Sequence, residues 1–149
     1  MIYRLYTPAD FDQLYGIEEL CFQPPFRFGR TYMRQILGQP NTAAWIAEED
    51  GRISGFAVVE WSRNAGEIRA YVQTIEVTPA ERGRGIGGEL LRRLEGSARE
   101  ALASSIWLHV DAENEIAMRF YEASHYVFVD KESNYYPQGR AAMVYGKQL

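Results

Sequence analysis

Cysteine is almost absent from this chain, which has one, Cys21, among 149 residues. A single cysteine cannot form a disulfide within the chain, and it excludes a zinc site built from several cysteines. We therefore expect Cys21 to be a small buried apolar side chain and expect no metal site.

Long apolar runs and an excess of positive charge are also absent. No run approaches the ~20 apolar residues that span a bilayer, and residues 1–5 do not form a signal peptide. The formal charge of -4 and pI of about 5.3 argue against a nucleic-acid binder held by overall charge. These absences predict a cytoplasmic protein that binds neither nucleic acid nor membrane. The sequence leaves open whether it is a monomer or a homodimer.

What is present fits one compact domain over residues 1–149. Hydrophobic residues make up 46% of the chain, enough for a core, and no repeat, low-complexity segment or linker interrupts it. Aromatic residues reach 13%, with ten tyrosines among them. That is more than a core needs, so we expect some of them to line a binding groove.

Periodicity and turn residues predict a mixed α/β order, β-α-α-β-β-β-α-β-α-β-β. Asp50-Gly51 and residues 64–66 mark hairpin turns. The expected helices cover residues 8–21, 29–38, 87–103 and 114–124, and the expected strands cover 2–6, 43–49, 53–61, 67–77, 105–110, 126–130 and 142–146. In helix 87–103 one face is expected to be buried, formed by Leu90, Leu91, Leu94, Ala98, Ala101 and Leu102. Strand 105–110 follows that crossover helix and should run parallel to strand 67–77.

A glycine-rich loop joins strand 67–77 to helix 87–103. It contains Gly83, Gly85, Gly87 and Gly88, which permit tight turns and a close approach of the backbone to a ligand. A helix start offers unpaired N–H groups that bind anions. Arg82 and Arg84 oppose the helix dipole there, and a bound pyrophosphate would resolve that conflict. The loop therefore predicts a phosphate-bearing cofactor.

Two nucleotide motifs compete for this loop. Gly83-x-Gly85-x-x-Gly88, with Asp111 after the next strand, matches a dinucleotide-binding fingerprint. Against it, residues 78–82 separate the strand from the first glycine, a meander precedes the motif, and few residues remain for further parallel strands. No Gly-Lys-Ser/Thr follows, which excludes a nucleotide-triphosphate loop.

Four segments resemble a known family. Residues 82–87 (Arg-Gly-Arg-Gly-Ile-Gly) resemble the acetyl-coenzyme A motif of the GNAT acetyltransferase superfamily, and residues 75–79 resemble the strand before it. Asn114-x-x-Ala117-x-x-Phe120-Tyr121 resembles its second motif. Residues 135–137 (Tyr-Tyr-Pro) resemble a segment of the protein N-terminal acetyltransferases, including bacterial enzymes that modify ribosomal proteins.

The resemblance covers essentially the whole chain. It implies a GNAT-like fold whose sheet splays between its fourth and fifth strands. It also implies an acetyl-CoA-dependent N-acetyltransferase acting on a primary amine, with a protein N-terminus as the expected acceptor. A small-molecule amine acetyltransferase and a non-catalytic acyl-CoA-binding module remain alternatives.

The same resemblance assigns the cofactor-binding residues. Backbone N–H groups of the loop would bind the pyrophosphate, its arginines would meet phosphates, and two strand residues would pair with the pantetheine amides as an added strand does. Asn114, also a suitable helix cap, would position the cofactor. The set is Ile75, Val77, Arg82, Gly83, Arg84, Gly85, Ile86, Gly87, Gly88 and Asn114.

Tyr121 is the candidate proton donor. Helical spacing places it on one face with Asn114 and with Ala117 or Met118, and the resemblance puts the family's acid tyrosine at this position. The alternative is that Tyr121 only packs in the core beside Phe120.

His109 is the candidate base. Strand alternation puts it on one face with Trp107 and Asp111, and histidine titrates near neutral pH. Bacterial relatives often have glutamate here, whereas some N-terminal acetyltransferases pair a histidine with a tyrosine at the position of Tyr71. A structural histidine is the alternative, and Glu76 is a third candidate base.

Two loops are expected to bind the acceptor. Their aromatic and proline residues suit a peptide N-terminus and equally a compact amine with an apolar body. The residues are Phe22, Pro25, Phe26, Tyr135 and Tyr136. Where the family ends its second-motif helix with Gly-Phe, this chain has His125-Tyr126, which leaves that turn open.

Overall fold

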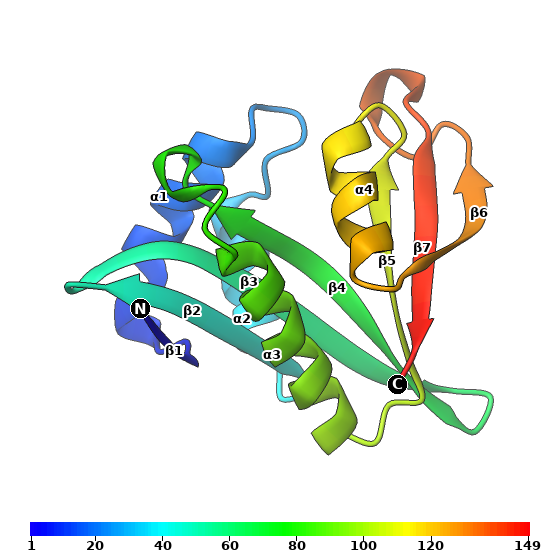
Figure 1. Cartoon of the computed structure of the whole chain (residues 1–149), viewed down its shortest axis with the longest axis horizontal. Coiled ribbons are helices and arrows are strands. Elements are labelled where there is room, and N and C mark those ends of the chain that lie inside the picture. Colours follow the sequence, from blue (N-terminus) through cyan, green and yellow to red (C-terminus); the bar gives the residue numbers. More distant parts are fainter.

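The computed structural model describes all residues, 1–149, as one mixed α/β unit (Figure 1). Its element order agrees with the predicted order, and short 3-10 turns lie at Pro8–Asp10, Pro79–Glu81 and Pro137–Gly139. The helices are α1 (Phe11–Cys21), α2 (Arg30–Leu37), α3 (Ile86–Glu100) and α4 (Glu115–Ala123). The strands are β1 (Ile2–Leu5), β2 (Thr42–Glu49), β3 (Arg52–Asn64), β4 (Glu67–Val77), β5 (Ser105–Asp111), β6 (Val127–Glu132) and β7 (Ala142–Gln148).

One seven-stranded sheet carries the fold, in the order β1-β2-β3-β4-β5-β7-β6. The pairing of β4 with β5 is parallel, as predicted, and it joins only Arg69–Tyr71 to Ser105–Trp107. Beyond that point β4 continues to Val77 and β5 to Asp111 without pairing to each other. The two strands diverge, as Figure 1 shows, which confirms the expected splay.

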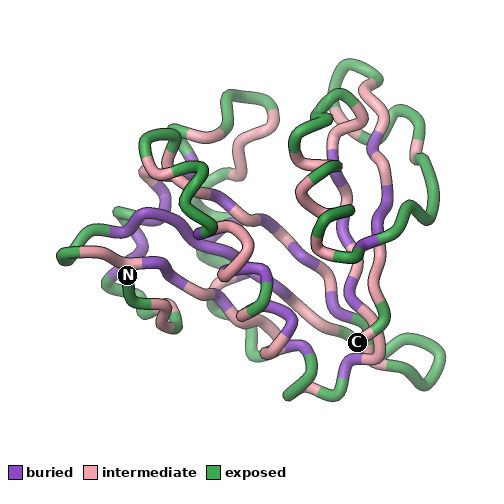
Figure 2. The backbone as a smooth tube through the Cα atoms, in the orientation of Figure 1, coloured by how far each residue is buried: buried purple, intermediate pink, exposed green.

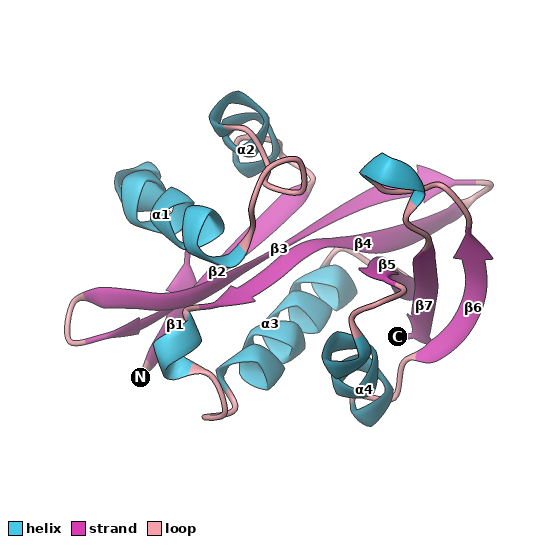
Figure 3. Cartoon of the chain, turned by 90° about the horizontal axis from the view of Figure 1, so that it is seen from above, coloured by secondary structure: helices cyan, strands magenta, loops and turns pink.

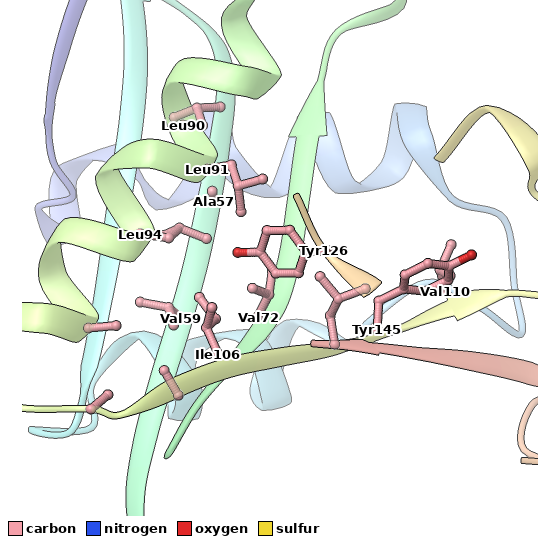
Figure 4. Close-up of a cluster of buried hydrophobic side chains, with 14 of the residues drawn as sticks. Ala57, Val59, Val72, Leu90, Leu91, Leu94, Ile106, Val110, Tyr126 and Tyr145 are labelled. Carbon is pink, nitrogen blue, oxygen red and sulfur yellow. The ribbon is translucent and has the colours of Figure 1, made fainter. Parts of the chain in front are cut away.

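The sheet separates two cores. Figure 2 shows the buried backbone concentrated in the central strands, and Figure 3 shows α1 and α2 on one face with α3 and α4 on the other. Along β3, Phe56 and Val58 pack into the α1–α2 core, whereas Ala57 and Val59 pack into the α3 core. Figure 4 shows the α3 core, where the α3 leucines meet Ala57 and Val59. This alternation is the period-2 pattern of a strand covered on both faces.

A β-bulge in β4 changes which residues at the end of that strand face each side of the sheet. Val58 pairs with Thr74 but Val59 pairs with Val72, so Gln73 is an extra residue in β4. Val72 before the bulge and Ile75 after it both pack against the α3 core. The opposite face of β4, on the side of the sheet covered by α1 and α2, therefore carries Tyr71, Thr74 and Glu76, as expected when a bulge inserts one residue.

The end of α3 differs from expectation. The helix predicted to reach residue 103 ends at Glu100, because Leu102 adopts a left-handed conformation (φ 66°) and the Ala103 N–H bonds the Ala98 carbonyl. Leu102, expected on the buried face, is therefore 79% exposed, which corrects that prediction.

After α4, His125 takes the positive φ (73°) that a glycine adopts at a helix end. The N–H of Tyr126 bonds the Tyr121 carbonyl, and the Tyr126 side chain is buried. The turn that the replaced Gly-Phe left open thus forms with His125-Tyr126.

No helix of this chain has the length and apolar character that crossing a bilayer requires.

Candidate functional site

A cavity of about 950 Å³ opens where β4 and β5 diverge. Both strands, α1, α4 and two loops contribute to its wall. The wall contains these residues singled out from the sequence: Phe22, Pro25, Phe26, Tyr71, Ile75, His109, Asn114, Tyr121, Tyr135 and Tyr136. The others lie outside it: Glu76, Val77, Arg82, Gly83, Arg84, Gly85, Ile86, Gly87 and Gly88.

Tyr71 and His109 meet at the point of divergence. Tyr71 forms the last rung of the β4–β5 pairing with Trp107, and His109 lies two residues further along β5. The Tyr71 hydroxyl and His109 Nδ1 are 2.8 Å apart in a hydrogen bond. Tyr135 stacks on the imidazole, with ring centroids 4.0 Å apart. Burial raises the pKa of Tyr71, so its phenol is neutral around physiological pH.

Sequence reasoning missed a carboxylate beside this pair. Nε2 of His109 lies 3.2 Å from Oε1 of Glu132, although the two groups are not aligned as a hydrogen bond. Glu132 lies at the end of β6, and only the pairing of β6 with β7 brings it near β5. No local pattern in the sequence could have identified it.

Tyr121 reaches the cavity from α4. The side chain of Asn114 caps this helix by accepting the Ala117 N–H at 3.1 Å. Asn114, Ala117 and Tyr121 all line the cavity, as their helical spacing predicts. The surrounding protein raises the pKa of Tyr121 through desolvation, so its phenol keeps its proton and is able to donate it.

The glycine loop forms the start of α3. Gly83 (φ 83°) and Gly85 (φ 80°) have left-handed backbones that residues with side chains rarely adopt. The first-turn N–H groups of residues 86–88 have no backbone acceptor. Such groups at a helix N-terminus bind phosphate oxygens well. A Cβ at Gly87 would lie 3.7 Å from the Phe120 ring, so this loop adjoins α4 next to the cavity.

The two loop arginines have protein partners in this structure. Arg84 forms ion pairs with Glu81 and, at 2.9 Å, with Glu49, and these carboxylates offset its charge at the helix start. Arg82 donates from Nε to the Val77 carbonyl at 3.1 Å. A bound phosphate would therefore have to draw both arginines away from these contacts.

Glu76 belongs to a buried pair of carboxyl groups with Glu18. Oε2 of Glu18 accepts the Phe28 N–H at 3.0 Å, and Oε2 of Glu76 accepts the Thr74 hydroxyl at 2.7 Å. The Oε1 atoms of both have no donor. Burial and the facing Glu18 raise the pKa of Glu76 well above its ordinary value. Glu76 lies outside the cavity wall whereas His109 lines it, so the geometry favours His109 over Glu76 as proton acceptor.

The two aromatic loops meet across the cavity mouth. Phe26 and Tyr136 make an edge contact with centroids 5.8 Å apart, and Tyr136 makes another with Tyr135 at 4.9 Å. Arg140 lies over the Phe26 ring and pairs with Asp111 at 2.8 Å. Residues 22–26 and 135–136, far apart in the sequence, thus form one aromatic lip.

The basic side chains in the cavity wall are neutralised by ion pairs, whereas some of the acidic ones are not. Arg27, Arg69 and Arg140 each pair with a neighbouring carboxylate. Glu60 lines the cavity and takes part in no ion pair, and Glu18 has the unpartnered oxygen described above. The uncompensated charge is therefore acidic, which favours a cationic or amine-bearing ligand.

Comparisons with known proteins identify the family of this chain. The family model "Acetyltransferase (GNAT) family" matches residues 11–126. The chain is 39% identical over 93 residues to streptothricin acetyltransferase of Streptomyces lavendulae, a match covering 62% of this chain and 48% of that protein. It is 30% identical over 130 residues to the [ribosomal protein bS18]-alanine N-acetyltransferase of Haemophilus influenzae, covering 87% of this chain and 84% of that one.

A solved structure shows the same fold. Arabidopsis thaliana Naa50, in complex with the bisubstrate analogue CoA-Ac-MVNAL, superposes with a TM-score of 0.85 at 24% identity, covering 99% of this chain and 98% of that one. The match to streptothricin acetyltransferase spans about half of that protein's length, whereas the family match covers most of this chain. This chain belongs to the GNAT acetyltransferase family.

Proposed function

We propose that the chain is an acetyl-CoA-dependent N-acetyltransferase that acts on a primary amine, with the N-terminal α-amine of a protein or peptide as its acceptor. One observation carries this proposal. The cavity between the diverging strands has the hydrogen-bonded Tyr71–His109 pair on one wall and Tyr121 on another, and we assign the pair as proton acceptor and Tyr121 as proton donor. Acyl transfer to an amine needs both.

The chain has the groups needed to hold acetyl-CoA. Free N–H groups at the start of α3 suit its pyrophosphate. Beyond Tyr71 the β5-facing edge of β4 has no partner strand, so Ile75 is able to pair with an amide-bearing arm. Acetyl-CoA, when bound, supplies the acetyl group as a thioester.

The chain's own residues handle the protons. The amine must lose a proton as it attacks, and Tyr71 with His109 is placed to accept it. Tyr121 is neutral and placed to protonate a departing thiolate from the α4 side. The aromatic lip narrows the mouth and limits the entry of water, which strengthens hydrogen bonds inside.

Two observations support a peptide acceptor. The lip is formed by two separate loops, and an extended chain is able to pass between them. The uncompensated Glu60 attracts a positively charged N-terminus. The relative from Haemophilus influenzae, which acts on a ribosomal-protein alanine, is consistent with this acceptor.

A small-molecule amine is the second candidate acceptor. The relative with 39% identity acetylates streptothricin by its name, and the same acidic, aromatic mouth suits a compact amine. A non-catalytic acyl-CoA-binding module is less favoured, because such a module has no need of neutral Tyr121 in the cavity.

The test of the proposal is Tyr121→Phe, which removes one oxygen and keeps the ring. We expect kcat to fall by about 10²–10⁴-fold, a typical contribution of general acid–base catalysis, with heat stabilisation by coenzyme A unchanged. Tyr3→Phe, which changes a tyrosine outside the cavity wall, is the matched control and should keep full activity. Full activity in Tyr121→Phe would refute the acid role, and stabilisation by NAD in place of coenzyme A would refute the cofactor.

The acceptor is tested by thiol release. Peptides with varied first residues are compared with a panel of small amines at equal concentration. We expect the higher kcat/KM among the peptides. A higher kcat/KM for the small amines would identify a small-molecule amine as the acceptor. The absence of thiol release with every amine would favour the non-catalytic acyl-CoA-binding module.

A further inference from the structure

Glu132 approaches His109 across an intervening strand. Glu132 of β6 pairs with Ala142 of β7, and Ala142 pairs with Asp111 of β5. Residues directly opposite in antiparallel strands point to the same face, so Glu132, Ala142 and Asp111 share the face that carries His109. The methyl side chain of Ala142 leaves the path open, and Glu132 Oε1 lies 3.2 Å from His109 Nε2.

A comparison with Asp130 shows why the small side chain of Ala142, between Glu132 and His109, matters. Asp130 pairs with Val144, which pairs with His109, so Asp130 lies in the same rung as the imidazole. Yet the larger Val144 separates the two, and the Asp130 carboxylate accepts the Lys131 N–H at 2.8 Å. Of these two acidic residues on β6, only Glu132 reaches the ring.

We propose that Glu132 is a positioning residue that holds His109 in the tautomer with its proton on Nε2, so that Nδ1 accepts the hydrogen bond from Tyr71. This proposal rests on the proposed function and deepens it, because it says that the proton passes from the Tyr71 hydroxyl to Nδ1 of His109. A neutral imidazole has one N–H and one lone pair, and the two nitrogens exchange these roles between tautomers.

The surroundings of the ring favour this tautomer. A carboxylate is acceptor-only, so the nitrogen facing Glu132 is best protonated. The His109 side chain is 8% exposed, which leaves little room for water to compete at Nε2. Glu132 is 43% exposed and free to rotate into line with that N–H. A hydroxyl both donates and accepts, so Tyr71 fits an unprotonated Nδ1.

The other neighbours of the ring do not supply a competing charge. Tyr71 of β4, Trp107 of β5 and Tyr135 from the loop after β6 contact it as aromatic rings. Asp111, two residues along β5, is held by Arg140 at 2.8 Å. Glu132 is therefore the carboxylate that selects between the tautomers.

This tautomer defines a balanced proton relay. An N–H bond of the attacking amine breaks as an O–H bond forms at Tyr71, while the original Tyr71 O–H bond breaks and an N–H bond forms at Nδ1. The product is an imidazolium with a proton on each nitrogen, and Glu132 stabilises its charge. Tyr71 starts and ends as a neutral phenol, as its burial requires.

The test is ¹⁵N NMR of the free protein labelled at histidine. The chain has two histidines, and exposed His125 is the internal reference. We expect His109 to show a protonated Nε2 and an unprotonated Nδ1. A protonated Nδ1 in the wild-type protein would overturn the proposal without any variant.

Three variants sharpen the test. Glu132→Leu should shift the Nδ1 resonance toward a mixture of tautomers and lower kcat by at least about tenfold with the acceptor KM unchanged, since a wrong tautomer misdirects the proton. Glu132→Gln keeps an acceptor oxygen and should restore the wild-type tautomer. Asp130→Asn removes the same charge from the same strand and should change neither readout.

The outcomes separate the two proposals. Identical ¹⁵N shifts in the wild type and a folded Glu132→Leu variant would overturn the role of Glu132. The tautomer is measured without acetyl-CoA, so a chain with the expected tautomer and no acetyl transfer would refute the proposed function alone.

Discussion

The two halves of the sheet differ in how they are covered. In the half formed by β1–β4, helices lie on both faces, and residues 53–59 of β3 are all buried. In the half formed by β5, β7 and β6, only α4 lies on one face, and five of the six residues of β6 are exposed. Figure 2 shows the same contrast. The first half holds most of the core, and the second half is the thinner layer.

The candidate chemistry lies at the seam between these halves. Tyr71 comes from the well-covered half, whereas His109 and Tyr121 come from the thin half. Only three backbone rungs join β4 to β5. Substitutions in the first half should therefore cost mainly stability, and substitutions at the seam should cost mainly activity.

The largest expected loss of stability is in the α3 core. Leu94 is fully buried there beside Val59, as Figure 4 shows. We expect Leu94→Ala to lower the free energy of unfolding by about 2–5 kcal/mol, because it removes buried methyl groups and leaves a cavity.

Urea unfolding measures this loss. The matched control is Leu102→Ala, the same substitution at a side chain that is 79% exposed, and it should change stability by less than about 0.5 kcal/mol. Equal losses for the two variants would contradict the placement of the core.

Glu95 links the halves from α3. It is buried and accepts the Tyr126 hydroxyl at 2.8 Å and the Lys147 ammonium at 3.1 Å, and Lys147 lies in β7. We expect Glu95→Ala to cost about 1–3 kcal/mol, because it leaves the Tyr126 hydroxyl without a partner and leaves the Lys147 ammonium with only the Ser124 carbonyl.

Hydrogen exchange locates that loss. Amides of β5 and β7 should open more readily in Glu95→Ala, while those of β2 and β3 keep their protection. Glu100→Ala, an exposed glutamate at the end of the same helix, should leave both sets unchanged. Uniform loss of protection across the sheet would show that the halves are not separable units.

Much of this architecture follows from local sequence. The glycines of residues 83–88 mark the strand-to-helix loop because few other residues adopt its backbone, and alternation in β5 places His109 in the cavity wall. Spacing along α4 likewise places Tyr121 there. In each of these cases a short pattern decides where a side chain points.

Other features depend on contacts between distant segments. Glu132 reaches His109 only through the β6–β7 register, and Glu18 meets Glu76 only because α1 packs on β4. The bulge at Gln73 is an extra residue that no turn signal marks. The end of α3 was misplaced because apolar Leu102 continues the helical pattern beyond the point where the backbone turns.

The carboxyl pair predicts a pH dependence within the first half. The pKa of Glu76 is raised above its ordinary 4.5, so above that pH the folded protein binds this proton more tightly than the unfolded chain. Its stabilising contribution is complete below about pH 4.5 and is lost as the pH rises through the raised folded value. The side chain in Glu76→Gln is neutral at every pH, so this variant should not show the loss.

Urea midpoints between about pH 5 and pH 8 measure the slope. Asp10 is the control of opposite sign, because hydrogen bonds from Arg4 lower its pKa to about 2. Its contribution is present above its ordinary 3.8 and is lost as the pH falls, so Asp10→Asn should affect the acid side. Parallel pH profiles for wild type and Glu76→Gln would contradict the raised pKa of Glu76.

The smallest expected effect lies on the outer edge of the thin half. Val127 is 63% exposed on β6 and lies opposite Gly146, which has no side chain. Val127→Thr keeps the shape and should change the free energy of unfolding by less than about 0.5 kcal/mol. The same substitution at fully buried Val59 should cost about 1–3 kcal/mol, because the new hydroxyl finds no partner in the α3 core. Similar urea midpoints for the two variants would mean that β6 is covered by another surface in solution, and the contrast between the halves would not hold.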